Sequence, residues 1–137
     1  MKTIILISCV KQKLNRTCKA EELYTSPFFK KSLAFAKSLK PDLIFILSAK
    51  YGLVALDREI EPYELTLNTF SVKEIKTWAT RTLEQLKRVA NLQEDKFIFL
   101  AGERYRKFLI PAIRNYDVPL EGLTIGRQLQ YLTGKLS

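Results

Sequence analysis

The chain has 137 residues, and 23 lysines and arginines against 14 acidic residues give it a net charge of +9. This length predicts one domain over residues 1–137, large enough to fold without a metal or a disulfide. The sequence has no histidine, which excludes Ser-His-Asp and Cys-His catalysis within the chain and every histidine-ligated metal site. So basic a surface favours a nucleic acid or nucleotide partner; a basic domain without such a partner is the alternative.

The two cysteines, Cys9 and Cys18, are too few for a disulfide framework or a four-cysteine zinc site. We therefore expect no metal and no cofactor, and a reducing cytoplasmic setting. Residues 6–9 match the cleavage pattern of a bacterial lipoprotein signal, but the apolar segment before Cys9 covers only residues 4–7 and is too short for a signal core. No apolar stretch approaches the length of a membrane span, so no membrane association is expected.

Taken in chain order, the first half alternates between strand and helix patterns. The apolar run over residues 3–8 predicts a first strand, and residues 20–24 predict a short helical turn. Ser26 and Pro27 look like an N-cap followed by proline at the first helical position, and this helix is expected to extend to Pro41. A second buried strand is predicted over residues 43–47.

The second half continues the alternation after an irregular segment over residues 53–68. Ser71 and Glu74 form a capping box that starts a long helix to about Ala90. A third strand is predicted over residues 97–101, followed by a helix to about Asn115 that Pro111 kinks or shortens. A loop over residues 118–122 and a short helix over residues 126–132 complete the prediction.

This order predicts an α/β fold of three layers, with a short, mainly parallel central sheet flanked by helices. The carboxyl ends of parallel strands lie along one edge of the sheet, where ligands bind in open α/β folds. The polar segments that follow the three strands, residues 8–9, 48–50 and 101–103, are therefore expected to converge on one cleft.

The first of these segments contains Ser8, Cys9 and Lys11, which together suit a phosphate group. Cys9 becomes a candidate nucleophile if Lys11 lowers its pKa, although a buried structural cysteine is the favoured interpretation. Because the chain has no glycine-rich loop, Walker-type and Rossmann-type phosphate sites are excluded.

The second segment, Ser48-Ala49-Lys50-Tyr51-Gly52, places a cation beside an aromatic ring. Lys50 suits a phosphate contact, and Tyr51 offers a ring on which a base can stack. The alternative is a solvated loop whose tyrosine covers the core.

Two further clusters carry candidate chemistry. Carboxylates in the acidic segment 57–64, Asp57 and Glu64 among them, suit activation of water or stabilisation of an oxocarbenium-like transition state. Solvated charges that pair with nearby lysines and arginines are the alternative. The stretch Gly102-Glu103-Arg104-Tyr105-Arg106-Lys107 has basic residues around a tyrosine and suits a nucleic-acid backbone; its alternative is the exposed first turns of a helix.

Several of these segments together resemble one family of small α/β domains of prokaryotes and phages that bears a Ser-Ala-Lys-Tyr-Gly-Leu signature. This family is distantly similar to the peroxide-stress YaaA family and to the core domain of archaeosine synthase, which itself resembles uracil-DNA glycosylases. The resemblance implies a uracil-DNA-glycosylase-like fold and, by distant analogy, nucleic-acid base chemistry. A glycosylase water-activating Asp motif and a His-containing loop are absent from the sequence. The matching segments are Ser8-Cys9-x-Lys11, Leu23-Tyr24-x-Ser26, residues 46–53, Pro62-Tyr63-Glu64-x-Thr66-Leu67, Ala101-Gly102-x-x-Tyr105 and Gly126-Arg127-Gln128.

The leading hypothesis is therefore an enzyme of the glycosylase or base-exchange type, acting on the N-glycosidic bond of a nucleobase. The alternative is a non-catalytic module that binds nucleic acid or a nucleotide. An acidic residue inside the cleft favours catalysis, whereas a lining of cations and aromatic residues alone favours binding. The candidate catalytic residues are Asp57, Glu64 and Cys9; the candidate binding residues are Lys11, Ser48, Lys50, Tyr51, Tyr63, Gly102, Glu103, Tyr105 and Gln128.

Overall fold

The computed structural model of the protein describes residues 1–8 and 14–136. Within these ranges, five strands form a central sheet in the order β4-β3-β1-β6-β7. Neighbouring strands are parallel except for β4, which is antiparallel to β3 at one edge. Their bounds are β1 Thr3–Ser8, β3 Leu43–Ser48, β4 Gly52–Ala55, β6 Lys96–Leu100 and β7 Asn115–Asp117.

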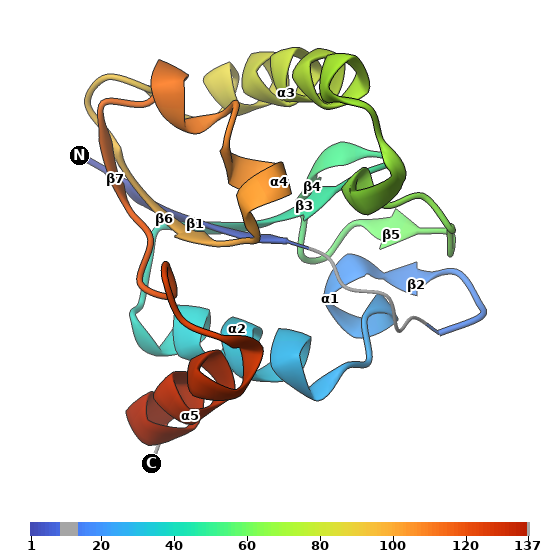
Figure 1. Ribbon diagram of the computed structural model, residues 1–137, viewed down its shortest axis with the longest axis vertical. Coiled ribbons are helices and arrows are strands. Elements are labelled where there is room, and N and C mark those ends of the chain that lie inside the picture. Colours follow the sequence, from blue (N-terminus) through green and yellow to red (C-terminus); the bar gives the residue numbers. More distant parts are fainter. Residues whose placement is uncertain (9–13, 137) are drawn as a thin grey trace.

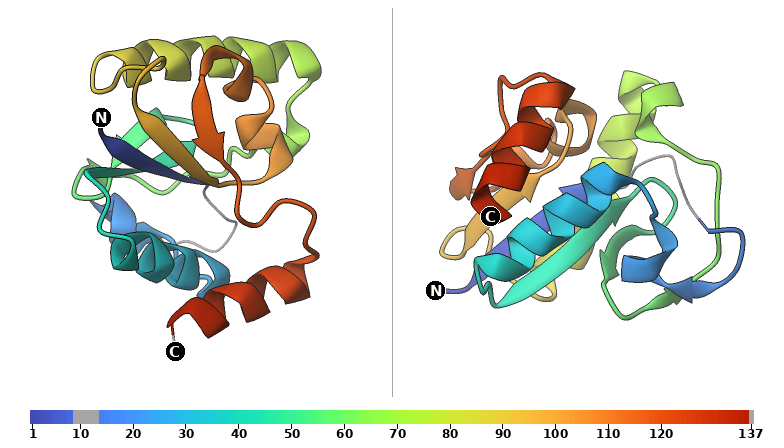
Figure 2. Two further views of the ribbon diagram at one scale, coloured as in Figure 1. Left: turned by 90° about the vertical axis from the view of Figure 1, so that its left-hand side faces the viewer. Right: turned by 90° about the horizontal axis from the view of Figure 1, so that it is seen from below.

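Helices cover both faces of the sheet and give the predicted three layers, as Figures 1 and 2 show. The long helix α3 (Val72–Lys87) and the short helix α4 (Glu103–Arg106) lie on one face. Helices α2 (Pro27–Ser38) and α5 (Ile125–Leu136) lie on the other and pack against each other.

Smaller elements complete the fold. A short antiparallel ribbon lies beside helix α1, to the right of the sheet in Figure 1. The remaining regular segments are two 3-10 turns in the loops that flank α3 and α4. The bounds are β2 Cys18–Lys19, α1 Ala20–Leu23, β5 Glu59–Ile60, η1 Leu67–Thr69 and η2 Ile110–Ala112.

The sequence explains why these elements form. Residues 4–7 of β1 are apolar and buried, as expected of a central strand that has helices over both faces. The Oγ atom of Ser26 accepts a hydrogen bond from the Phe29 amide at 3.1 Å and caps α2. At the start of α3, Ser71 and Glu74 form the predicted capping box. The predicted buried strands and this long helix are therefore confirmed.

Two local predictions were wrong. The segment expected to be irregular contains β4, because the chain turns back on β3 immediately after Ser48, and β5, which pairs with β2. The helix expected to reach Asn115 ends at Arg106, and Asn115–Asp117 forms β7 instead. Pro111 lacks the amide hydrogen that a continuing helix needs, and it lies in the 3-10 turn η2. The last helix is longer than predicted, covering Ile125–Leu136.

In the described part of the chain, no helix combines the length and the apolar character that crossing a membrane requires.

Candidate functional site

The carboxyl ends of β1, β3 and β6 lie side by side, as the sequence predicted. Ser8 at the end of β1 is in register with Leu47 of β3, and the Gly102 amide after β6 donates a hydrogen bond to Ser8 Oγ at 3.3 Å. Three segments that are far apart in the sequence therefore meet at one edge of the sheet.

A cleft of about 1020 Å³ opens at this edge, beyond the ends of β1 and β6. We call it the edge cleft. Its walls come from α4 and the residues after it, from the loop before α5, and from the amino-terminal ends of α2, α3 and α5. The lining consists of Ser8, Ser26, Phe28, Asn68, Val72, Ile75, Leu100, Ala101, residues 102–108, Val118, residues 120–123, Ile125 and Gln128.

The charged residues of the edge cleft fall into a fixed pair and a free group. Arg106 donates to the Ala101 carbonyl at 2.9 Å and lies 3.7 Å from the carboxylate of Glu121, so it ties α4 to the loop before α5. Within residues 1–8 and 14–136, Glu103, Arg104 and Lys107 have no ion-pair partner, and all three are exposed. These three side chains are available to a ligand.

The amino-terminal ends of two long helices add to the positive potential of the cleft. Ser26 and Phe28 belong to the start of α2, and Ile125 is the first residue of α5. The backbone N–H groups in the first turn of a helix carry a partial positive charge, which favours anions. Together with Arg104 and Lys107, they make the cleft suited to a negatively charged ligand.

The segment Ser48-Ala49-Lys50-Tyr51-Gly52 is a tight turn between β3 and β4, with Ser48 paired to Gly52. Ser48 is fully buried, and its Oγ atom accepts hydrogen bonds from the amides of Lys50 and Tyr51 at 3.3 and 3.1 Å. The same hydroxyl donates to the Tyr63 hydroxyl at 2.9 Å, which lies 2.6 Å from that of Tyr24. Ser48 therefore shapes the turn.

Helix α3 holds this turn from the other side. The indole N–H of Trp78 donates to the Ser48 carbonyl at 2.8 Å. Gln85 accepts from the Leu53 amide at 2.9 Å and donates to the Tyr51 carbonyl at 3.2 Å. Gly52 has a φ of +76°, and an added Cβ would collide with the Gln85 carboxamide oxygen. Folding alone thus explains most residues of this turn.

Lys50 is exposed and Tyr51 is half-buried, and neither lines the edge cleft. The ammonium group of Lys50 lies 5.3 Å from the centre of the Tyr51 ring, and the guanidinium group of Arg58 lies 5.0 Å from it. The ring also meets Tyr63 edge-on, with centroids 5.7 Å apart. Two cations therefore lie over the ring on which the sequence predicted a stacked base.

The acidic candidates are also outside the lining of the edge cleft. Asp57 is exposed in the turn that follows β4, and β4 runs from the carboxyl end of β3 back toward its amino end. Glu64 is exposed next to Tyr63, whose own side chain is buried. The structure thus does not bring these two carboxylates into the cleft.

The remaining candidates divide into two groups. Gly102, Glu103, Tyr105 and Gln128 line the edge cleft. The Tyr105 ring contacts Trp78 edge-on at 5.8 Å, and this contact connects the cleft wall to the β3–β4 turn. Cys9 and Lys11 lie outside the described residues.

Comparison with known proteins adds a family. A model described as a family of unknown function, DUF6884, matches residues 4–134. The chain belongs to this family. No curated protein matches the chain. The DUF6884 match covers the whole central sheet apart from Thr3, the first residue of β1, and it includes all residues that line the edge cleft.

Sequence reasoning missed the contribution of Ser26, Phe28, Phe108 and the loop over residues 120–123 to the edge cleft. The sequence did contain a signal for Ser26 and Phe28. In a parallel α/β sheet, the helix after a strand starts near the strand's carboxyl end, so the N-cap Ser26 belongs at that edge. Among the described residues, no group of three or more His, Cys, Asp or Glu side chains is placed to hold a metal ion.

Proposed function

We propose that the edge cleft binds a nucleotide unit and that the protein acts on the N-glycosidic bond of its base. One observation carries this proposal. A free carboxylate, Glu103, stands in the cleft beside two cations, Arg104 and Lys107, and the aromatic ring of Tyr105. These groups match the sugar, phosphate and base of a nucleotide.

The size and lining of the cleft support binding of a base. Its volume of about 1020 Å³ is at the upper end of typical ligand pockets, and a nucleotide fits into such a space. Phe28, Tyr105 and Leu120 supply apolar and aromatic surface on which a base can pack.

The charges support binding of a phosphate. Arg104 and Lys107 are exposed cations that lack an ion-pair partner in the described ranges, and charge-assisted hydrogen bonds from such groups are the usual protein contacts to phosphate. The first turns of α2 and α5 point positive partial charge toward the same space.

Glu103 supports the chemical step. Cleavage of an N-glycosidic bond develops positive charge on the sugar, which a nearby carboxylate stabilises or quenches by positioning water. Glu103 takes the role that the sequence had suggested for Asp57 or Glu64. The resemblance to YaaA and to the archaeosine synthase core, with its uracil-DNA-glycosylase-like fold, supports base chemistry by distant analogy.

The test is release of free base from nucleosides, mononucleotides and oligonucleotides. Glu103→Gln keeps the shape of the side chain and removes its charge, so we expect release to fall about 100-fold or more while binding persists. Asp57→Asn and Glu64→Gln serve as matched controls and should retain activity, because neither residue lines the cleft. Full activity in Glu103→Gln, with loss in Asp57→Asn, would contradict the assignment.

A second candidate function is a non-catalytic nucleic-acid-binding module. The observation that favours it is the position of Asp57 and Glu64 outside the cleft, which leaves Glu103 as the one unpaired carboxylate among the described lining residues. In this case the wild-type protein binds oligonucleotides through Arg104 and Lys107 but releases no base. Glu103→Gln then strengthens binding, because it removes a negative charge from the path of the phosphate.

A further inference from the structure

Two cations from different elements meet at one aromatic ring beside the edge cleft. The ammonium group of Lys76, on α3, lies 5.5 Å from the centre of the Phe108 ring, and that of Lys107, just after α4, lies 5.6 Å from it. The ring attracts both cations, but the two like charges repel each other. An anion placed between them removes this repulsion.

Glu103 lies four residues before Lys107 but makes no ion pair with it, so no carboxylate in the described ranges supplies that anion. Lys73 lies one turn before Lys76 on the exposed face of α3, and Arg104 lies on α4. Within the described ranges, none of these cations takes part in an ion pair. The carboxylate of Glu74 is held by the Ser71 amide at 2.8 Å in the capping box. We call Lys73, Lys76, Arg104 and Lys107 the cation patch.

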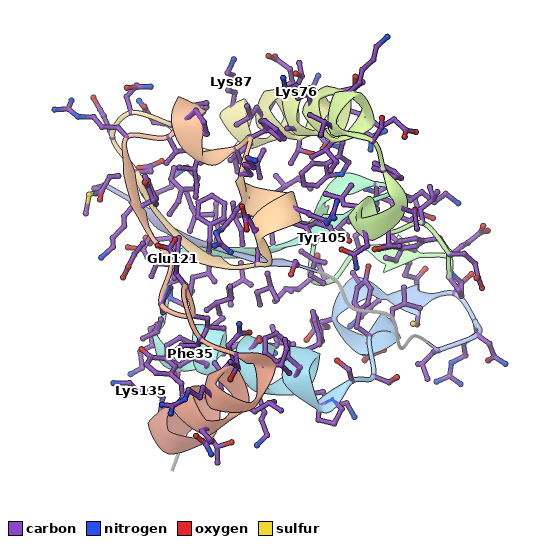
Figure 3. The ribbon with its side chains drawn as sticks, in the orientation of Figure 1. Phe35, Lys76, Lys87, Tyr105, Glu121 and Lys135 are labelled. Atoms are coloured by element: carbon purple, nitrogen blue, oxygen red, sulfur yellow. The ribbon has the colours of Figure 1, made fainter. Side chains whose placement is uncertain are left out.

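Two other lysines, Lys87 and Lys37, each form an ion pair with a carboxylate. Lys87, at the opposite end of α3, lies 3.2 Å from the Glu84 carboxylate, and Lys37 on α2 lies 3.2 Å from that of Glu21. Figure 3 shows Lys76 and Lys87 at separate places along the same helix. Lys87 and Lys37 therefore each have a carboxylate partner, whereas Lys76 has none within the described ranges.

The cation patch extends beyond the edge cleft. Arg104 and Lys107 line the cleft, whereas Lys73 and Lys76 do not and stand on the outer surface of α3. A mononucleotide held inside the cleft uses the first two cations. A ligand that uses all four carries several negative charges and leaves the cleft in the direction of α3.

We propose that the cation patch binds the phosphodiester backbone of a polynucleotide, one base of which occupies the edge cleft. This inference rests on the proposed function and narrows its ligand from a nucleotide of any size to a nucleic-acid strand. Arg104 and Lys107 line the cleft, and Lys76 lies near the same Phe108 ring as Lys107, so positive charge continues from the cleft onto α3, where it can contact successive phosphates of such a backbone.

The experiment compares two probes at several salt concentrations: a mixture of 5′-mononucleotides and a single-stranded oligonucleotide of about 12 nucleotides. We expect the oligonucleotide to bind at least about tenfold more tightly, which is the effect of one added charge-assisted contact. Lys76→Ala should weaken oligonucleotide binding about tenfold, lower the slope of log K against log salt by about 0.7, and leave mononucleotide binding unchanged.

Lys87→Ala is the matched control, because it removes an exposed lysine of the same helix whose charge is already paired. It should change neither affinity nor slope. Equal affinity for both probes, or an effect of Lys87→Ala as large as that of Lys76→Ala, would overturn the inference while leaving nucleotide binding in the cleft intact. Absence of binding of either probe, with unchanged thermal unfolding of all variants, would overturn the proposed function as well.

Discussion

The β3–β4 turn and the edge cleft lie at the same edge of the sheet but use their polar groups in opposite ways. At the turn, Ser48 and the three side chains that bond this segment, those of Tyr63, Trp78 and Gln85, all make hydrogen bonds within the protein. In the cleft, Arg104 and Lys107 are exposed and lack an ion-pair partner in the described ranges. A short motif of polar residues at a strand end can thus serve folding, while the ligand-facing groups lie on neighbouring elements.

The largest expected effect on stability comes from a substitution in the β3–β4 turn. Gly52→Ala places a side chain at a φ of +76° and against the Gln85 carboxamide, which also bonds the Leu53 amide. The cost in unfolding free energy should be about 2–4 kcal/mol, from backbone strain together with a weakened hydrogen bond. Denaturant unfolding measures it.

Gly122→Ala is the matched control for this substitution. Gly122 also has a positive φ, of +81°, but open space surrounds the position of its missing Cβ. Its cost should be limited to the backbone term of about 1–2 kcal/mol. Equal losses for both substitutions would show that the contact between the turn and Gln85 contributes nothing.

A second test removes a single hydroxyl. Tyr63→Phe keeps the ring against Tyr51 but deletes the oxygen that accepts from Ser48 and bonds Tyr24. We expect a loss of about 1–2 kcal/mol in stability, because the buried hydroxyls of Ser48 and Tyr24 each lose one hydrogen-bond partner. Oligonucleotide binding should be unchanged. Weaker binding with normal stability would restore the sequence-based assignment of Tyr63 to a base-binding site.

A third test compares one cation from each region. Arg104 lines the edge cleft, and Lys50 lies on the turn outside it. Both are exposed, so Arg104→Ala and Lys50→Ala should each change stability by less than about 0.5 kcal/mol. Arg104→Ala should weaken oligonucleotide binding about tenfold, and Lys50→Ala much less. The reverse order in filter binding would move the ligand site to the turn.

The smallest expected effect is a loss of stability at acidic pH. Hydrogen bonds from the Ser71 backbone and side chain hold the pKa of Glu74 below its ordinary value. Because the folded-state pKa is lowered, this contribution to stability is present above the unfolded pKa and is lost as pH falls through the folded value. Hydrogen bonds from the amides of Asn91 and Lys2 lower the pKa of Asp95 in the same way. Stability should therefore decline below about pH 4.

The acid test also distinguishes the start of α3 from the β3–β4 turn. Glu74→Gln should flatten the decline measured by denaturant unfolding at neutral and acidic pH, since it removes the titrating group at the start of α3. The groups that bond the turn, including the Arg81 guanidinium that donates to the Lys50 carbonyl, do not titrate between neutral and acidic pH, so the stability lost in Gly52→Ala should be the same at both pH values. A loss that varies with pH would indicate that a group that titrates in this range contributes to the turn.

The sequence predicted the parts of the fold that depend on local patterns. The apolar run of β1, the N-cap Ser26 and the capping box of α3 each have a short-range signal, and all three are present. Strand β7 has none, because its residues are exposed and it pairs with β6 along a single edge. The position of such a strand depends on the rest of the sheet.

The sequence predicted which edge of the sheet carries the candidate site, but only some of the residues that line it. Gly102, Glu103 and Tyr105 line the cleft because they follow a parallel strand, which is a general property of α/β sheets. Lys50 and Tyr51 also follow such a strand, but there the chain reverses into the antiparallel β4 and the turn packs on α3. No local pattern indicates that reversal. Strand β4 has only four residues, too few for its apolar character to distinguish a strand from a loop packed on the core.

The central position of β1 has a consequence for folding kinetics. Its neighbours in the sheet are β3 and β6, and the Lys2 amide bonds the carboxylate of Asp95, 93 positions along the chain. No hairpin can form this part of the sheet, and its closure brings together segments separated by most of the sequence. Such non-local pairing is entropically costly in the transition state, so we expect the protein to fold slowly for its size. Until β6 docks, one edge of β1 stays unpaired and open to association with another chain.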